Sequence, residues 1–324
     1  MNQMLRHFAV TAIALMLLTG ATMADEFGAA ADVPSDMLAE AEKDIAMPRI
    51  EGRWVAFYNG REGRVIYDLT TRTEYDRIRQ WSNIAYDLGN NYVIDAERQN
   101  MSYYNFEKKN RYKWRTRYEG VDHLVVGSKW LAMTWGEYNK SFKMRLHDVV
   151  AMQGGGRDRK VVAKDVALAG IAMEQDLLVW GDYRFDQAGA YLYDTKADKK
   201  RRITESQTVT AIDTDGKIVV WKDDDAMHRF NAALGTGEIL FFQAKSDSIR
   251  KFKIDGDWLV YQDDNDVIYA YHFPTGKELR VTSEIRHKGL VNLADISGRN
   301  IIFTVQANQL WVAELPEKVA FELE

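Results

Sequence analysis

Short apolar runs recur along the chain at a nearly constant spacing. Successive runs end 38 to 45 residues apart, at Phe57, Asp95, Trp135, Trp180, Trp221, Tyr261 and Thr304. A turn with a glycine precedes all but one of these runs, and a polar hairpin follows each of them. Short apolar runs bounded by turn residues are typical of buried β-strands. The repeated spacing indicates seven copies of one small structural unit.

The segment from Ile254 to Glu284 is the best-preserved copy of this unit. It contains a turn at Asp255-Gly256, an apolar strand from Trp258 to Tyr261 and an acidic hairpin from Asp263 to Asp266. A strand with alternating aromatic residues follows, and a last strand runs from Leu279 to Thr282. Together with the strand before the turn, these segments give four strands in the unit.

We predict an all-β protein, a seven-bladed β-propeller with four-stranded antiparallel blades over residues 44–324. A small twisted sheet has two apolar faces, and a ring of such sheets buries both of them. A ring of six blades with one stray unit is the alternative, because the second and seventh units are the most divergent. We expect the fourth strand of the last blade at the C-terminal end, in Lys318–Glu324.

The first 24 residues have the pattern of a secretory signal peptide. Arg6 and His7 precede an apolar run from Phe8 to Leu18, and small residues continue to Ala24. This run is too short for a stable membrane span, so we expect cleavage after Ala24 and no membrane span in the mature chain. For residues 25–43 we expect a tether or a short helix capped by Ser35, with a latch packed on the body as the alternative.

Charge and cysteine content narrow the class of protein. The chain of 324 residues has 43 basic and 48 acidic residues and a net charge of −5. This balance argues against a nucleic-acid-binding protein. The chain has no cysteine, which excludes disulfides and thiolate metal sites. We therefore expect a periplasmic or secreted monomer that is stabilised by its core alone.

Three segments of the repeats resemble a known family. IDGDWLVYQDDNDVIYAYHFPTGKELRVTSE, TDGKIVVWKDDDAMHRFNAALGTGE and MEQDLLVWGDYRFDQAGAYLYDTKADKKRRITES are similar to the exported bacterial β-propeller repeats of the TolB type. The resemblance covers residues 44–324 as a repeat pattern and implies a propeller that binds other molecules. Two features differ: no unit has the proline of the family's Ser-Pro-Asp-Gly turn, and the α/β domain that precedes the TolB propeller has no counterpart. The resemblance therefore does not extend to a TolB-like lipoprotein partner.

Acidic residues gather in the hairpins between the second and third strands of three successive units. Asp182 stands in the first of these hairpins, Asp223-Asp224 in the second and Asp263-Asp264 in the third. Propeller geometry places such hairpins on one rim. Asp and Asn also favour tight turns through side-chain hydrogen bonds to the backbone. Both a structural turn and a site for a cation or a cationic partner are consistent with this pattern.

Units three and four share a hairpin with the sequence Trp-Gly-acid-Tyr, at residues 135–138 and 180–183. We expect the tryptophans in the core and the tyrosines exposed, where they could stack on a sugar or a peptide. The predicted binding rim comprises eight residues, Glu137, Tyr138, Asp182, Tyr183, Asp223, Asp224, Asp263 and Asp264.

Signatures of catalysis are missing from the sequence. The mature chain has five histidines, which do not fall on equivalent positions of neighbouring units, namely His123, His147, His228, His272 and His287. We therefore expect no shared metal or acid–base centre. No Gly-x-Ser-x-Gly motif occurs. The sequence accordingly predicts no catalytic residue, no metal and no cofactor.

A basic stretch marks the last strand of unit two. Arg111, Lys113, Arg115 and Arg117 alternate with other residues, so they share one face of a strand. Such a face could hold an anionic glycan or a lipid head group. Charge on an exposed edge strand also protects against edge-to-edge aggregation.

The sequence therefore favours a non-enzymatic, exported binding or scaffold propeller that recognises a protein, peptide or glycan of the bacterial envelope. A propeller-type polysaccharide lyase or hydrolase is the alternative, and its structural sign would be paired carboxylates roughly 5–10 Å apart. A purely structural role in an envelope assembly is the third possibility.

Overall fold

The computed structural model describes residues 31–41, 44–60, 63–78, 85–89, 91–97, 99–115, 120–141, 144–153, 157–184, 186–206, 208–224, 226–240, 248–282, 289–317 and 319. The expected signal peptide, residues 1–24, lies outside these ranges. Within them, no helix is long and apolar enough to cross a membrane.

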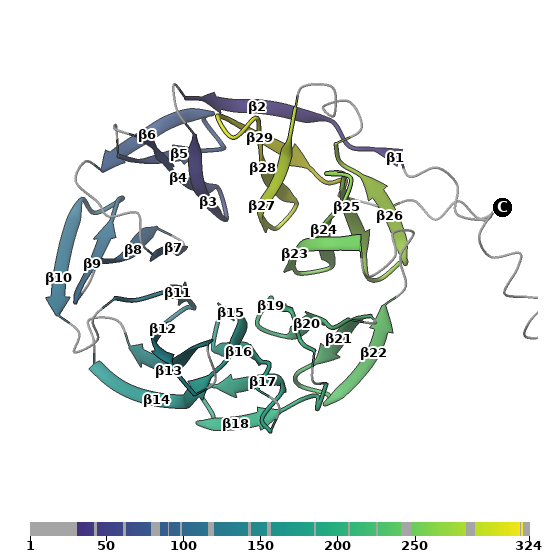
Figure 1. Cartoon of the computed structure of the whole chain (residues 1–324). Helices are drawn as coiled ribbons and strands as arrows, with labels where there is room; N and C mark the ends of the chain where they lie inside the picture. Colours follow the sequence, from purple (N-terminus) through teal and green to yellow (C-terminus); the bar gives the residue numbers. More distant parts are fainter. Residues whose placement is uncertain are drawn as a thin grey trace, which may run out of the picture.

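The regular structure of the described residues consists of β-strands in a ring of seven sheets around a central opening (Figure 1). The predicted seven-bladed propeller is confirmed, and the six-bladed alternative is wrong. In each blade the first strand lies nearest the axis, and its neighbours follow outward in antiparallel order.

The strands match the predicted units closely. Blade one contains β3 (Ile45–Glu51), β4 (Trp54–Asn59), β5 (Arg64–Asp68) and β6 (Thr73–Ile78). Blade two contains β7 (Ala85–Gly89), β8 (Tyr92–Glu97), β9 (Asn100–Asn105) and β10 (Asn110–Arg115). Blade three contains β11 (His123–Val126), β12 (Trp130–Asn139), β13 (Met144–Gln153) and β14 (Arg157–Val166). Blade four contains β15 (Leu168–Glu174), β16 (Leu177–Asp182), β17 (Gly189–Asp194) and β18 (Lys199–Arg202).

The remaining blades follow the same order. Blade five contains β19 (Ala211–Thr214), β20 (Ile218–Lys222), β21 (Met227–Asn231) and β22 (Thr236–Leu240). Blade six contains β23 (Ile249–Asp255), β24 (Trp258–Asp263), β25 (Ile268–His272) and β26 (Lys277–Arg280). Blade seven takes only three strands from the end of the chain, β27 (Val291–Ser297), β28 (Asn300–Val305) and β29 (Gln309–Glu314).

The core lies between the blades. Seven clusters of buried apolar side chains are present, and each joins two neighbouring blades. Between blades three and four, for example, Trp180 packs with Val149 and Ala151 and is 1% exposed. A single blade could not bury both of its apolar faces, so stacking in a ring stabilises all of them together.

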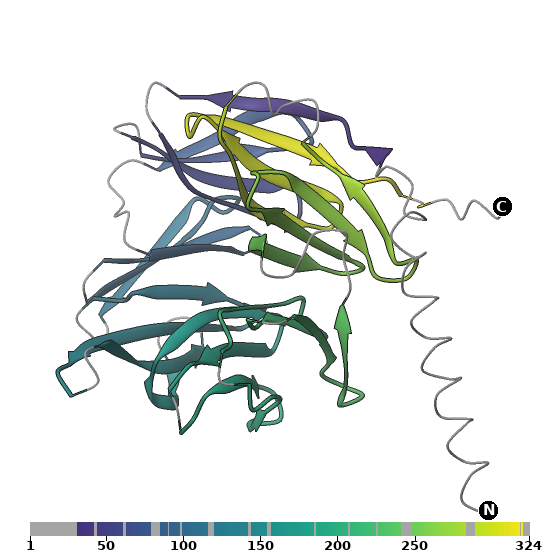
Figure 2. The same ribbon diagram turned by 45° about the vertical axis from the view of Figure 1, so that its right-hand side comes forward.

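The N-terminal segment closes the ring. Strand β2 (Ser35–Glu40) pairs antiparallel with β29 and is the fourth strand of blade seven. Before it, β1 (Ala31–Asp32) pairs parallel with β26 of blade six. Figure 2 shows β2 running along the outside of the ring.

Two predictions at the ends of the chain are therefore wrong. The short helix capped by Ser35 is a strand, because β29 offers an open edge whose backbone groups the segment satisfies. The fourth strand expected at Lys318–Glu324 cannot pair with β29, whose two neighbours are β28 and β2. Of that segment only Val319 lies within the described residues. The alternative prediction of a latch packed on the body agrees with this geometry.

Candidate functional site

A charged channel runs through the centre of the ring. Because the two faces of each blade pack against its neighbours, the innermost strand turns its free edge toward the axis. Each innermost strand has one equivalent position, two residues before the turn that follows the strand. From blade one to blade seven this position holds Arg49, Asp87, Val125, Ala172, Asp213, Lys253 and Asp295. Five of these seven equivalent residues are charged, and together they line a cavity of about 280 Å³.

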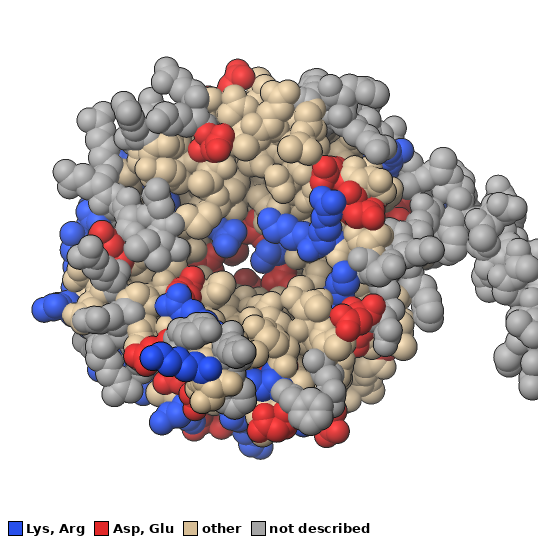
Figure 3. Space-filling model, viewed as in Figure 1, with Lys and Arg blue, Asp and Glu red and all other residues tan. Residues whose placement is uncertain are grey.

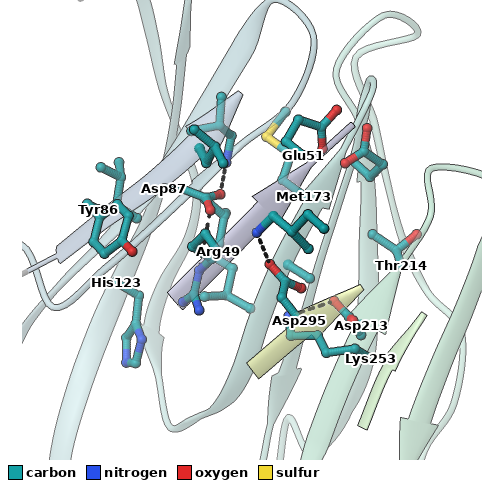
Figure 4. Close-up of a pocket in the computed structure, with 18 of the residues that line it drawn as sticks. Arg49, Glu51, Tyr86, Asp87, His123, Met173, Asp213, Thr214, Lys253 and Asp295 are labelled. Carbon is teal, nitrogen blue, oxygen red and sulfur yellow. Dashed lines mark hydrogen bonds and ion pairs between the residues drawn. The ribbon is translucent and has the colours of Figure 1, made fainter. Parts of the chain in front are cut away.

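Three aspartates of this set fasten neighbouring blades (Figure 4). The Asp87 carboxylate accepts a hydrogen bond from the Val126 amide at 2.8 Å, which joins blade two to blade three. Asp213 accepts one from the Ile254 amide at 3.1 Å, and Asp295 accepts one from the Ile50 amide at 3.3 Å. Each bond runs from the side chain of one blade to the backbone of the next. The channel therefore contributes to holding the ring together.

Two cations offset part of the cost of burying Asp87 and Asp213, although burial still raises the pKa of Asp87 to about 6 and that of Asp213 above its usual range. Nε of Arg49 lies 3.5 Å from Asp87, and Nζ of Lys253 lies 3.6 Å from Asp213. Burial would otherwise oppose ionisation of an aspartate, and a nearby cation favours it. In Figure 3 basic side chains stand at the edge of the central opening and acidic side chains lie deeper inside it.

Blades three and four are joined in another way. The amide of Ser128 donates to the backbone carbonyl of Gln175 at 3.0 Å. At the neighbouring Gly127 a Cβ would lie only 2.1 Å from this same oxygen, so the position requires glycine. Here the two turns touch directly, which agrees with the uncharged Val125 and Ala172 at the positions where other blades carry Asp87, Asp213 and Asp295.

Carboxylates gather where the innermost strands end. Burial, together with the negative charge of Asp255, raises the pKa of Glu51 to about 7, and burial together with the negative charge of Glu51 raises that of Glu174 to about 8. The pKa of Asp255 is also raised by burial, although this carboxylate accepts a hydrogen bond from the Gly298 amide at 2.5 Å. This end of the channel therefore favours protonated acids at neutral pH.

These pKa shifts predict a stability that falls as the pH rises. An unfolded glutamate has a pKa of about 4.3. Between that value and the raised pKa of Glu174, about 8, the folded state binds more protons than the unfolded state. The free energy of unfolding should therefore decrease by about 4 kcal/mol from pH 5 to pH 9 through Glu174 alone. Urea unfolding across this range checks the prediction.

Glu174→Gln should remove a large part of this pH dependence, whereas Glu205→Gln should leave it unchanged, because the Glu205 side chain is 87% exposed. Equal slopes in the two variants would assign the pH dependence to other groups.

The predicted rim residues divide into buried and exposed members. Asp182, Asp223 and Asp263 are 2%, 7% and 6% exposed. Each accepts backbone hydrogen bonds within its hairpin, for example Asp263 from the amides of Asn265 and Val267. Asp182 also pairs with Arg184 at 3.0 Å. These three aspartates hold the hairpins in shape, as the turn interpretation predicts.

The other members of the predicted binding rim whose side chains are described are exposed. Tyr183 is 44% exposed, and Asp224, Asp264 and Glu137 also reach the surface. The side chain of Tyr138 lies outside the described part of the structure. Since the second strands all run antiparallel to the innermost strands, these hairpins lie on one face of the ring. We call the exposed set, Glu137, Tyr183, Asp224 and Asp264, the hairpin rim.

The histidines were predicted not to converge, and this is wrong for one pair. The rings of His123 and His147 lie 6.2 Å apart in blade three, and Asp122 lies 3.4 Å from His147. Pairing between strands of one blade brings them together, which an alignment of equivalent positions cannot reveal. His228 contacts Asp223 at 2.8 Å, and His272 contacts Thr275 at 2.9 Å.

His287 lies outside the described residues. Among the residues that are described, no three side chains of His, Asp or Glu converge in a way suited to a metal ion.

The ring of blades and its charged channel define the class of the protein as a seven-bladed β-propeller. Solved structures with the same fold include the β-propeller domain of Cps50 (Swd1) from Myceliophteria thermophila, with a TM-score of 0.62 and 12% identity over 87% of this chain and 100% of that one. Another is KlAtg21 in complex with the coiled coil of AgAtg16, with a TM-score of 0.61 and 10% identity over 85% of this chain and 95% of that one.

The computationally designed Ika8 protein is also similar, with a TM-score of 0.57 and 13% identity over 86% of this chain and 87% of that one. At these identities the similarity shows the fold alone. No protein-family model matches the chain, and no curated protein matches it either.

Proposed function

We propose that this chain is a binding propeller that recognises a protein, a peptide or a glycan through the hairpin rim. The main observation that supports this proposal is the arrangement of the hairpins in blades four to six. In each of them a buried aspartate fixes the turn, and the next residue, Tyr183, Asp224 or Asp264, is presented to solvent. Side chains held by a rigid turn lose little conformational entropy on binding, which favours affinity.

The chemistry of the hairpin rim indicates the kind of ligand. Glu137, Asp224 and Asp264 are acceptors for amines and hydroxyl groups. Tyr183 adds an exposed ring that can stack on a sugar face or pack on an aliphatic side chain. A peptide segment with lysine or arginine, or a glycan with free hydroxyl groups, fits this combination.

Two finer parts of the proposal rest on the sequence. The repeats resemble those of the TolB type, and the first 24 residues have the pattern of a signal peptide. We therefore place the protein in the periplasm or the medium, with an envelope component as its ligand.

The test is recovery of a partner by the mature protein from an envelope extract after cross-linking. Ala at Tyr183, Asp224 and Asp264 should abolish recovery of the partner, and circular dichroism should remain unchanged. Asp263 is avoided because its loss would disturb the turn itself.

Asp257→Ala is the matched control, because Asp257 is an exposed acid at the opposite end of the same blade as Asp264. Unaltered recovery by the triple variant, or an equal loss in the control, would contradict binding at the hairpin rim.

A further inference from the structure

Basic residues are concentrated on the outer strands of three successive blades. Strands β10, β14 and β18 carry ten described basic side chains, Arg111, Lys113, Arg115, Arg159, Lys160, Lys164, Lys199, Lys200, Arg201 and Arg202, against two acidic ones, Asp158 and Asp165. We call the ten basic residues the basic flank. The outer strands of the other four blades, β22, β26, β2 and β6, carry three basic and six acidic residues.

The basic flank is exposed and only weakly neutralised. All four residues of β18 are exposed, as are Arg111, Lys113 and Arg115 on β10. In the described part of the structure, ion pairs join Lys160 to Asp198 and Arg202 to Glu205. These two pairs involve two of the ten basic side chains, so an excess of positive charge remains on these strands.

The outer strands of blades three and four lie side by side. Nζ of Lys200 on β18 donates to the carbonyl of Val162 on β14 at 3.2 Å, which fixes these two edges side by side. Figure 1 shows β10, β14 and β18 following one another along the curved outer perimeter of the ring.

Protection against aggregation does not explain this distribution. Charge of either sign on an edge strand hinders pairing with another edge. Three successive edges with an excess of basic residues, on a chain with a net charge of −5, create a local field opposite to that of the whole molecule. Such a field attracts a polyanion to this side of the ring.

From these features we infer that the basic flank binds a linear acidic polysaccharide. A flat anionic bilayer would touch a convex perimeter along a narrow line, whereas a flexible chain can follow it across three blades. The cations of the three strands can pair with the carboxylates of such a chain along its length. The basic flank is distinct from the hairpin rim, so an experiment that disproves binding at one surface leaves the proposal for the other surface intact.

The test measures binding of the mature protein to immobilised polygalacturonate at 20 mM and at 300 mM salt, with neutral dextran as a blank. We expect binding at low salt that weakens strongly at high salt, because exposed charges are screened. The variant Lys113→Gln/Lys164→Gln/Lys199→Gln replaces one exposed lysine on each strand and should bind about tenfold more weakly.

The control Lys129→Gln/Lys140→Gln/Lys217→Gln makes the same charge change at exposed lysines outside the basic flank and should bind like the unmodified protein. An equal loss in both variants, or no binding at low salt, would overturn the inference. Binding to phosphatidylglycerol vesicles but not to polygalacturonate would also overturn it and assign the basic flank to a membrane.

Discussion

A mature chain that begins at Ile45, without β1 and β2, should lose the closed ring and most of its stability. Val33 and Ala41 are each 7% exposed, and Leu38 packs on the cluster between blades seven and one. Their loss exposes apolar surface and leaves the edge of β29 without a partner. We expect a decrease of about 4–6 kcal/mol in the free energy of unfolding. Urea unfolding followed by tryptophan fluorescence measures it.

A chain that begins at Ala31 is the control and should unfold like the full mature protein. A synthetic peptide of residues 31–41 should restore part of the stability of the shortened chain, because it can pair again with β29. A shortened chain as stable as the control would show that β2 contributes little to closure.

Arg64→Ala should be among the most destabilising single substitutions. Arg64 is fully buried, its guanidinium carbon lies 3.5 Å from the centroid of the Tyr86 ring, and Nη1 lies 3.9 Å from Asp95. This group joins blade one to blade two, where the Tyr86 hydroxyl also donates to the Ala56 carbonyl at 2.9 Å. Removal of one partner of a buried ion pair costs about 3–5 kcal/mol.

Arg72→Ala provides the comparison at the surface. Arg72 pairs with Asp36 at 3.0 Å, but both side chains are more than 60% exposed, so the expected loss is below about 1 kcal/mol. Thermal unfolding of the two variants should separate them clearly. Equal and small losses of stability in the two variants would show that the buried Asp95 does not depend on its ion pair with Arg64.

The repeated blades could be predicted because local sequence determines them. Each apolar second strand ends in a hairpin with its own turn chemistry, and WLVY at residues 258–261 lies within β24 as expected. The closing strand could not be predicted in this way. Residues 35–40 do not alternate strictly between buried and exposed side chains, and their partner β29 lies about 270 residues later in the chain. Tertiary context decided between helix and strand.

The candidate site was predicted only in part. Asp182, Asp223 and Asp263 were predicted as part of the binding rim with a turn role as the other interpretation, and they are buried within their hairpins, whereas the exposure of Tyr183 agrees with the expectation. The charged channel was missed, because its residues come from seven different strands that become neighbours only in the ring. A usable signal was present: a charged residue stands two positions before the turn in five of the seven units. The charge asymmetry of the outer strands likewise appears only when blades are compared around the perimeter.

Closure by β2 has a consequence for the order in which the molecule is made. Strand β2, which is made early, must wait for β29, since Asp36 lies opposite Val312 in the finished sheet. Blades two to five can assemble from contiguous sequence during synthesis, whereas blade seven cannot be completed until the whole propeller has emerged. Pairing over such a long sequence separation is slow. Closure is therefore the natural late step of folding, and a chain released before β29 is made would retain an unpaired N-terminal strand.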